Sequence, residues 1–178
     1  MATVSYGLKI TNAYHVFDAT LRIYRDAVRY FMEIASLHYE ELILLTGYTT
    51  NRGKRVTAQQ HRQQYMEHLT HSTKDRDADY KKFDKDFYKF PSYLRRDAIN
   101  TAVGNIFAYH SQLKNWEKNG RQGRRPFLKK KPAAMPCFYR GNTFLQDGTS
   151  VSLKLFDGHD WIWKTVHVRN TDWQYVTR

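Results

Sequence analysis

Hydrophobic and polar positions follow two different periods in the first part of the chain. Residues 3–10 alternate between apolar and polar side chains, which predicts a half-buried strand. From residue 12 to about residue 46 the apolar positions recur every three or four residues. This spacing predicts a long helix that is buried on more than one side. Gly47 is expected to end the helix, and the polar, glycine-bearing residues 48–56 predict a loop.

The middle of the chain also has a helical pattern. A helix is predicted over 57–70, because Thr57 and Gln60 have the spacing of a capping box. A charged helix is predicted over 77–88, with aromatic side chains on one side. A third helix is predicted from Pro91 to Trp116, since proline favours the first turn and the apolar positions that follow keep helical spacing. This part of the chain is therefore expected to form an α-helical subdomain.

The pattern changes after Trp116. Residues 117–136 are rich in Gly, Pro, Arg and Lys, which predicts an extended basic connection. Alternation returns over 151–155 and 161–169, and the Asp-Gly-His-Asp sequence between them reads as a turn, so two strands are predicted. We expect the strand over 3–10 to join these later strands. The fold class is thus α+β, with the helices inserted into a small β-barrel or sheet.

The composition is that of a globular protein. The chain has 178 residues, enough for one domain or two small ones with a real core. Hydrophobic residues make up 41% of it and the mean hydropathy is −0.74, so a disordered or membrane-spanning chain is not expected. The single cysteine, Cys137, excludes an internal disulfide framework and any site built from several cysteines. We therefore expect a reducing, cytoplasmic environment.

Net charge is the most informative property of the composition. The chain has 29 Lys and Arg against 17 Asp and Glu, a formal charge of +12, and 15% of its residues are aromatic. Cations neutralise phosphates and aromatic rings stack on bases, so this composition favours a nucleic-acid partner. The excess is concentrated over 118–140, a tract without acidic residues that contains the cations Lys118, Arg121, Arg124, Arg125, Lys129, Lys130, Lys131 and Arg140.

The basic tract 118–140 is the first candidate site. Its glycines and prolines prevent a helix, and Phe127, Phe138 and Tyr139 are interleaved with its cations. An extended segment of this kind can follow a nucleic-acid backbone and stack on exposed bases. The alternative is a solvated loop between two subdomains. Phosphate contact is favoured, because a loop of this length usually has a function.

Two smaller groups are further candidates. Tyr93, Arg95 and Arg96 lie at the start of the third predicted helix, where backbone amides favour phosphate and arginines can grip a backbone or read guanine. The alternative is an exposed polar surface. Trp161 and Trp163 share one face of a predicted strand, where they form either a stacking platform or part of the core. The core is the favoured interpretation.

Signals for catalysis are sparse. His61, His68 and His71 can lie on neighbouring turns of a helix, but the sequence supplies no further ligand of fixed geometry, so ordinary structural histidines are favoured. The sequence has no Walker glycine loop, dinucleotide fingerprint, nucleophile elbow or His-Glu-x-x-His motif. We expect no cofactor for this chain, which by itself looks like a binder.

The order of features along the chain is itself a pattern. After the first strand, the long helix and the helical insertion come the block Phe90-Pro91-Ser92-Tyr93-Leu94-Arg95-Arg96-Asp97-Ala98-Ile99, the helix end at Trp116, a basic Gly-Arg-Arg-Pro linker, Pro136-Cys137-Phe138-Tyr139, Val151-Ser152-Leu153-Lys154-Leu155 and Trp161-Ile162-Trp163. This order resembles the N-terminal half of the TnpB (OrfB) family of transposon-encoded RNA-guided nucleases and of their descendants, the compact type V CRISPR effectors. The resemblance covers nearly the whole chain. Its individual motifs are loose, and their order carries it.

The resemblance implies a wedge β-barrel with an inserted recognition lobe. Residues 1–11 would be the first wedge strand, 12–116 the helical recognition lobe, 117–136 the basic linker and 137–178 the remaining wedge strands. It also implies that the chain holds a guide RNA, grips the guide–target heteroduplex and contacts a motif that flanks the DNA target. The family often has glutamine where this chain has arginine, so the resemblance does not carry over the family's base preference.

The residues and the resemblance together give a set of candidate nucleic-acid contacts. Some come from the start of the third predicted helix and the others from the basic tract. They are Ser92, Tyr93, Arg95, Arg96, Arg121, Arg124, Arg125, Phe127, Lys129, Lys130, Lys131, Tyr139 and Arg140.

One departure from the family shapes the functional hypotheses. In the family a RuvC-type nuclease domain, and usually a four-cysteine zinc ribbon, follow this region, and residues 1–178 contain neither. Mg²⁺ is therefore expected only for that nuclease part. The first hypothesis is a fragment or split piece of an RNA-guided DNA endonuclease, with a guide RNA, target DNA and the RuvC-type part as partners. The second is a stand-alone, nuclease-free repressor of the same ancestry. The third is a small metalloenzyme that uses His61, His68 and His71.

Overall fold

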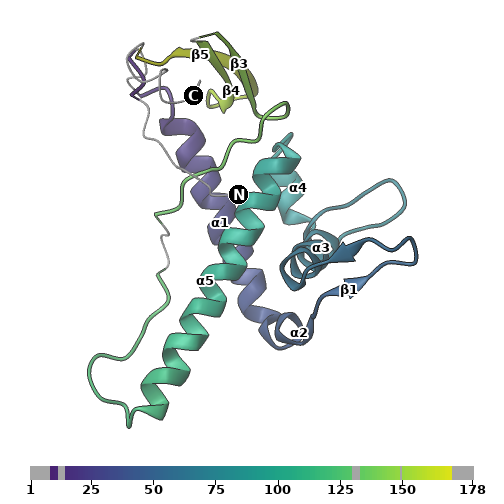
Figure 1. Cartoon of the computed structure of the whole chain (residues 1–178), viewed down its shortest axis with the longest axis vertical. Helices are drawn as coiled ribbons and strands as arrows, with labels where there is room; N and C mark the ends of the chain where they lie inside the picture. The colour runs from purple at the N-terminus through teal and green to yellow at the C-terminus, as the bar shows by residue number, and fades with distance from the viewer. Residues whose placement is uncertain (1–8, 12–14, 130–132, 149, 170–178) are drawn as a thin grey trace.

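The computed structural model describes residues 9–11, 15–129, 133–148 and 150–169. These residues form an α+β fold of helices and small antiparallel sheets (Figure 1). The elements in chain order are α1 (Asp18–Leu37), α2 (Tyr39–Leu44), β1 (Tyr48–Thr49), β2 (Arg55–Val56), α3 (Ala58–Thr70), α4 (Lys82–Asp86), α5 (Ser92–Lys118), β3 (Phe144–Asp147), β4 (Ser150–Phe156) and β5 (Trp161–His167).

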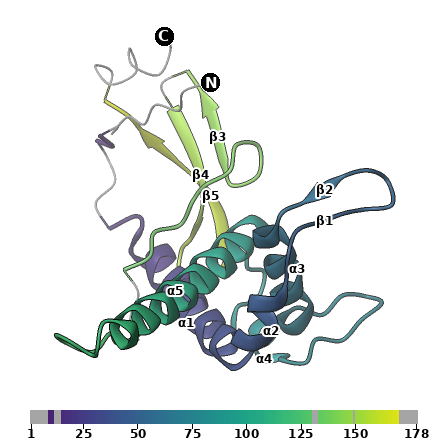
Figure 2. The ribbon, with the colours of Figure 1, turned by 60° about the horizontal axis from the view of Figure 1, so that its bottom comes forward.

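The two long helices, α1 and α5, lie side by side and form the main core (Figures 1 and 2). Tyr24 and Phe31 from α1 are fully buried against this interface, as are Leu94 and Ile106 from α5. The short helices α3 and α4 close the core from one side with buried apolar side chains of their own. No helix among the described residues is long and apolar enough to cross a membrane.

Local sequence signals place two helix starts correctly. The capping box at α3 is confirmed, because the Thr57 hydroxyl accepts from the Gln60 amide at 3.2 Å and the Gln60 side chain accepts from the Thr57 amide at 2.9 Å. Helix α5 begins at Ser92, directly after Pro91. Both signals act over one helical turn, so they do not depend on the rest of the fold.

Two predicted helices are shorter than expected. The helix predicted up to residue 46 is interrupted at His38, whose ring bonds the Tyr80 hydroxyl at 2.9 Å while its backbone leaves the helical region. The helix predicted over 77–88 is reduced to α4. The Ala78 amide donates to the Ser72 hydroxyl, and the Tyr80 amide donates to the Leu69 carbonyl near the end of α3. This stretch therefore packs on α3 instead of forming a helix.

Strands β3, β4 and β5 form an antiparallel sheet in that order. The predicted strands at 151–155 and 161–169 and the turn between them are confirmed by β4, β5 and the Asp157–Asp160 turn. Ile10 forms an antiparallel bridge with Val168, so the end of the predicted first strand reaches the sheet. Residues 1–8 lie outside the described residues. Within those that are described, the sheet is open, and the closed barrel stays a prediction.

The sheet is joined to the helices at the β4–β5 turn. The buried Thr20 hydroxyl of α1 accepts from the Phe156 amide at 2.8 Å, and Trp161 packs edge-on against Phe90 with ring centroids 5.1 Å apart. Lys89 and Asp160 form an ion pair across the same junction at 3.2 Å. Trp161 thus belongs to the helical core, while the sheet keeps a small core of its own.

Candidate nucleic-acid interface

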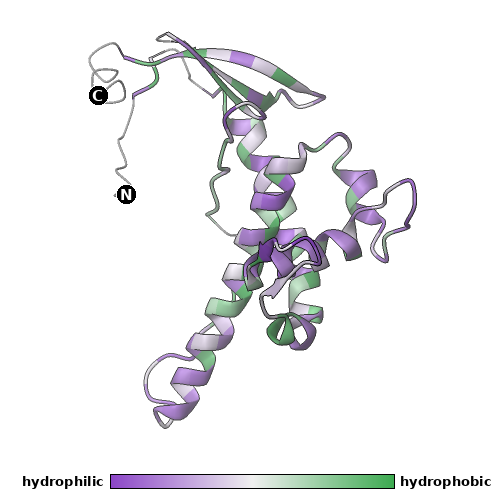
Figure 3. Cartoon of the chain, turned by 45° about the vertical axis from the view of Figure 1, so that its right-hand side comes forward, coloured by the Kyte–Doolittle hydropathy of each residue, from purple (hydrophilic) through white to green (hydrophobic). Residues whose placement is uncertain are grey.

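The C-terminal part of α5 and the loop that follows it project from the rest of the helices (Figure 1). We call residues 114–129 the basic arm. Its cations are all exposed, its loop is hydrophilic along most of its length (Figure 3), and within the described residues no carboxylate pairs with them. They are Lys114, Lys118, Arg121, Arg124, Arg125 and Lys129.

Two cations of the basic arm lie beside aromatic rings. The guanidinium of Arg121 lies 5.9 Å from the Trp116 ring centroid, and that of Arg124 lies 5.1 Å from the Phe127 centroid. The Trp116 indole also donates to the Gly123 carbonyl at 3.3 Å, which folds the loop back on the helix. Phe127 is 60% exposed. The arm therefore presents cations and an accessible ring together, as a surface for phosphates and bases requires.

A buried polar cluster fixes the chain that returns from the arm. Asp97 of α5 accepts from the Tyr24 hydroxyl at 2.6 Å and from the Cys137 amide at 2.9 Å, and Arg25 donates to the Ala134 carbonyl at 3.0 Å. Burial, reinforced by Asp97, raises the pKa of Tyr24 far above its usual value, so this hydroxyl stays protonated as a donor. The arm is thus held at both ends.

A groove of about 360 Å³ lies between the β1–β2 hairpin, α3, the start of α5 and Tyr139. The predicted residues Tyr93, Arg96 and Tyr139 line it, and the two tyrosine rings lie 5.4 Å apart. Amide side chains are its other feature, and the Asn100 amide donates to Gln63 at 3.1 Å. Amides and guanidinium groups are the side chains that read base edges. The remaining polar residues that line the groove are Lys54, Gln60, Gln64 and Glu67.

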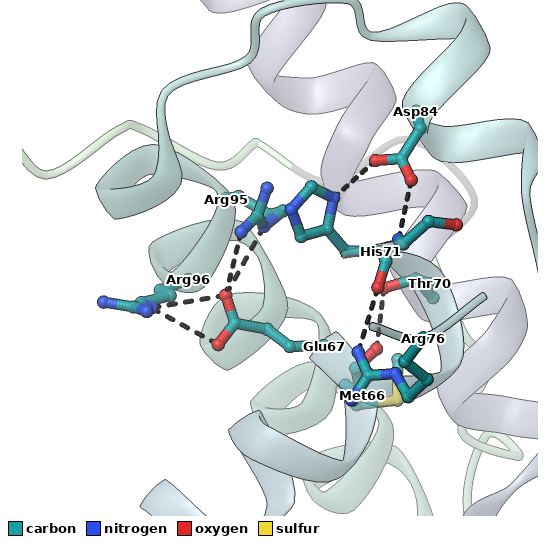
Figure 4. Close-up of polar contacts among 9 residues, drawn as sticks. Met66, Glu67, Thr70, His71, Arg76, Asp84, Arg95 and Arg96 are labelled. Carbon is teal, nitrogen blue, oxygen red and sulfur yellow. Dashed lines mark hydrogen bonds and ion pairs between the residues drawn. The ribbon is translucent and has the colours of Figure 1, made fainter. Parts of the chain in front are cut away.

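Glu67 of α3 pairs with both arginines at the start of α5 (Figure 4). Its carboxylate accepts from Arg95 at 3.3 Å and from Arg96 at 3.2 Å. The Arg95 side chain is only 10% exposed, whereas that of Arg96 is 45% exposed. The predicted role of Arg95 as a surface contact is therefore corrected: its guanidinium joins α3 to α5, and only Arg96 faces the groove.

The other predicted contacts lie as follows. Ser92 is exposed at the start of α5, and Arg140 is exposed directly after Tyr139. Lys130 and Lys131 lie outside the described residues. The structure thus places Tyr93, Arg96 and Tyr139 at the groove, and Ser92 and Arg140 in neither region. The arm holds Arg121, Arg124, Arg125, Phe127 and Lys129.

The β1–β2 hairpin is a part of this surface where the sequence predicts a loop. Its residues Arg52, Lys54 and Arg55 are exposed, and Lys54 reaches the groove. The signal was present, because Gly53 between two residue pairs of strand type indicates a hairpin turn. The groove's glutamines were also missed, since nothing in the sequence of α3 shows which side faces α5.

The three candidate histidines, His61, His68 and His71, lie in separate surroundings. His61 bonds the Thr46 carbonyl at 2.8 Å, His71 pairs with Asp84 at 2.5 Å, and His68 is exposed. In the part of the chain that the structure describes, no three His, Cys, Asp or Glu side chains are grouped closely enough to hold a metal ion. Cys137 is exposed.

Comparison with known proteins gives one assignment. No curated protein and no solved structure matches the chain. A family model described as the Aq_aa04 family matches residues 2–157, which include the basic arm and every residue that lines the groove. The match covers most of the chain, and the protein therefore belongs to the Aq_aa04 family.

Proposed function

We propose that this chain is a nucleic-acid-binding module that binds a phosphate backbone along α5. The observation that carries the proposal is the basic arm, where exposed cations lie beside two aromatic rings, one of them accessible, and no carboxylate among the described residues pairs with them. Phosphate contacts position a protein on a nucleic acid, whereas contacts with base edges give specificity. The arm supplies the first kind of contact and the groove the second.

The geometry of α5 supports a single ligand for both regions. Arg96 at the groove and Lys114 at the arm are separated by five full helical turns, so they lie on the same face. At 1.5 Å per residue they are about 27 Å apart, which corresponds to about eight base pairs of a duplex. A nucleic acid of modest length is therefore able to contact the groove and the arm together.

The finer form of the proposal comes from the resemblance to the TnpB family. We infer that the module holds a guide RNA and the guide–target heteroduplex and contacts the motif that flanks the target DNA, with a RuvC-type nuclease part as its partner. The bridge between Ile10 and Val168 supports the wedge barrel that this resemblance implies, because it brings the N-terminal segment to the sheet. A cytoplasmic location is part of the same proposal.

The RNA that accompanies the protein tests this finer proposal. The chain is purified from cells of its source in salt that removes nonspecific ligands, and the retained RNA is sequenced. One abundant, structured RNA is expected for a guide-bound module. A mixture of RNA fragments that is lost at moderate salt would contradict the guide-bound form and leave a binder that acts by occupancy.

Salt dependence tests the arm itself. In the arm variant, Arg124→Gln, Arg125→Gln and Lys129→Gln are combined. In the control variant, Lys81→Gln, Lys82→Gln and Lys85→Gln remove the same charge from the exposed region around α4. The arm variant is expected to flatten the slope of log K against log salt by about 0.7–0.9 for each phosphate that it no longer neutralises. Equal slopes for the two variants would show that only net charge matters and would overturn the role of the arm.

A further inference from the structure

We propose that the open face of the β3–β4–β5 sheet is a separate site for an unpaired nucleotide, on whose base Trp163 stacks. The inference rests on the proposed function for the chemical class of the ligand. It uses residues that belong to neither the basic arm nor the groove. Trp163 also lies outside the stretch that matches the family model, which ends at residue 157.

The register of the sheet gathers the residues of this site. Trp163 pairs with Lys154, and the neighbouring row aligns Leu145, Ser152 and Thr165 across the three strands. Since side chains alternate along a strand, all of these residues share one face. The opposite face contains the buried Val151, Leu153, Leu155 and Val166 of the sheet core. The face with Trp163 is thus the one that the sheet core does not use.

Helices cover only one end of this face. Trp161 lies on the same face two residues before Trp163, but it is 6% exposed because the helical core packs over it. Trp163 lies just beyond that cover and is 44% exposed, and Leu145 in the next row is 46% exposed. A large amphipathic ring in an exposed patch is typical of an interaction surface.

The neighbours of Trp163 have the chemistry that a nucleotide requires. The Lys154 ammonium lies 5.6 Å from the ring centroid, on a flexible side chain that can reach a phosphate. The Ser152 and Thr165 hydroxyls bond each other at 3.0 Å and offer donors and acceptors to a sugar or a phosphate. On this face of the described strands, the acidic residue is Asp147, which lies at the far end of β3 from Trp163. The charge beside the ring is therefore positive.

Unpaired nucleotides fit this face better than a duplex. In a duplex the bases are stacked on one another, so a ring on a protein surface reaches a base plane only at an end or after the base is extruded. Every base has such a plane, so stacking on one exposed ring tolerates any sequence. The chemistry of the ligand is thus an unpaired base with its phosphate, from either RNA or DNA.

Replacement of Trp163 tests the site with a matched control from the same strand. Trp163→Ala removes the ring and Trp163→Phe keeps a smaller one. Ile162→Ala truncates a side chain that is 40% exposed on the opposite face. Binding of short oligothymidine, short oligouridine and a DNA duplex is measured by fluorescence anisotropy. Trp163→Ala is expected to weaken binding of the unpaired oligonucleotides about tenfold, as removal of one base–aromatic stack does. Trp163→Phe and Ile162→Ala are expected to change it little.

The outcomes separate this inference from the proposed function. If Trp163→Ala binds oligonucleotides as tightly as the wild type does while the arm variant binds them more weakly, the stacking site is refuted and the nucleic-acid-binding function stands. If the wild-type chain binds none of the three ligands, both are refuted. If the wild type binds oligouridine more tightly than oligothymidine and Ser152→Ala loses this preference, the result would support the site and identify RNA as the source of the unpaired base. Equal weakening for both oligonucleotides in Trp163→Ala would support it for either source.

Discussion

Glu67→Gln is expected to destabilise the protein and, at the same time, to strengthen its binding to nucleic acid. In the folded chain one carboxylate, 15% exposed, balances two guanidinium groups where α3 meets the start of α5 (Figure 4). Glutamine keeps the shape and one acceptor oxygen but removes the negative charge. Arg95 then stays buried without a counter-charge, while Arg96 is released into the groove.

The size of the stability change follows from the burial of the pair. Removal of one partner from a buried ion pair costs about 3–5 kcal/mol. The hydrogen bonds here are long, at 3.2–3.4 Å, and Gln retains one acceptor, so we expect a loss of about 2–3 kcal/mol. For a chain of this size that loss lowers Tm by about 4–12 °C. The control is Asp77→Asn, which breaks the exposed pair with Lys81 and is expected to cost less than about 0.5 kcal/mol.

The binding change is read from salt titrations with the same protein samples. A freed Arg96 that contacts one more phosphate steepens the slope of log K against log salt by about 0.7–0.9. Circular-dichroism melts give the stability and anisotropy gives the affinity. Unchanged stability would refute the burial argument for Arg95. Weaker binding by a variant that is still folded at the assay temperature would refute the assignment of the groove, because it would mean that Glu67 itself holds the ligand.

Three further predictions concern single interactions. Cys137 is exposed as a residue, but partial desolvation of its thiol, together with the charge of Asp97, raises the thiol's pKa. Asp97→Asn is expected to lower that pKa and to speed alkylation by iodoacetamide at pH 8, and an unchanged pH–rate profile would contradict it. Partial burial raises the pKa of Asp84, but hydrogen bonds from Ser72 and His71 outweigh it and the net pKa lies below its usual value. The folded state then binds fewer protons than the unfolded state, so the stability from Asp84 is complete above about pH 4 and is lost as the pH falls through the lower folded pKa. In urea denaturation, the difference in unfolding free energy between the wild type and Asp84→Asn should shrink toward acid. A difference that stays constant with pH would exclude this linkage. Thr57→Ala is expected to cost about 1 kcal/mol in urea denaturation and Thr57→Ser almost nothing, because serine keeps the cap; equal losses would show that the methyl group matters more.

The parts of the fold that the sequence predicted are those decided within a few residues. The cap at Thr57, the start of α5 after Pro91 and the β4–β5 turn each depend on side chains and backbone within one turn. The concentration of cations in the basic tract was equally visible, since charge is a property of the sequence itself. Such features are unchanged by what packs around them.

Three of the errors involve contacts between residues far apart in the chain, whereas the missed β1–β2 hairpin is local. The predicted long helix is interrupted at His38, whose ring bonds Tyr80, a residue 42 positions later. Arg95 looked like a surface contact because its partner, Glu67, is 28 positions away on another helix. Alternation placed Trp161 and Trp163 on one face, but it could not show that helices cover the first and leave the second exposed. Periodicity gives the face of an element, and only tertiary packing decides whether that face is buried.

The charge of α5 is graded along its length, and the proposed function gives this gradient a meaning. Near the start, Arg95 is buried against Glu67 and Arg96 shares the same carboxylate, whereas Lys114 and Lys118 at the other end are exposed. Long-range attraction depends on exposed net charge, so under the proposed function a polyanion is expected to approach the arm first. Contacts at the groove form over shorter distances and require Arg96 to exchange Glu67 for the ligand. That exchange costs part of the ion pair, so it favours ligands whose bases also satisfy the amides of the groove.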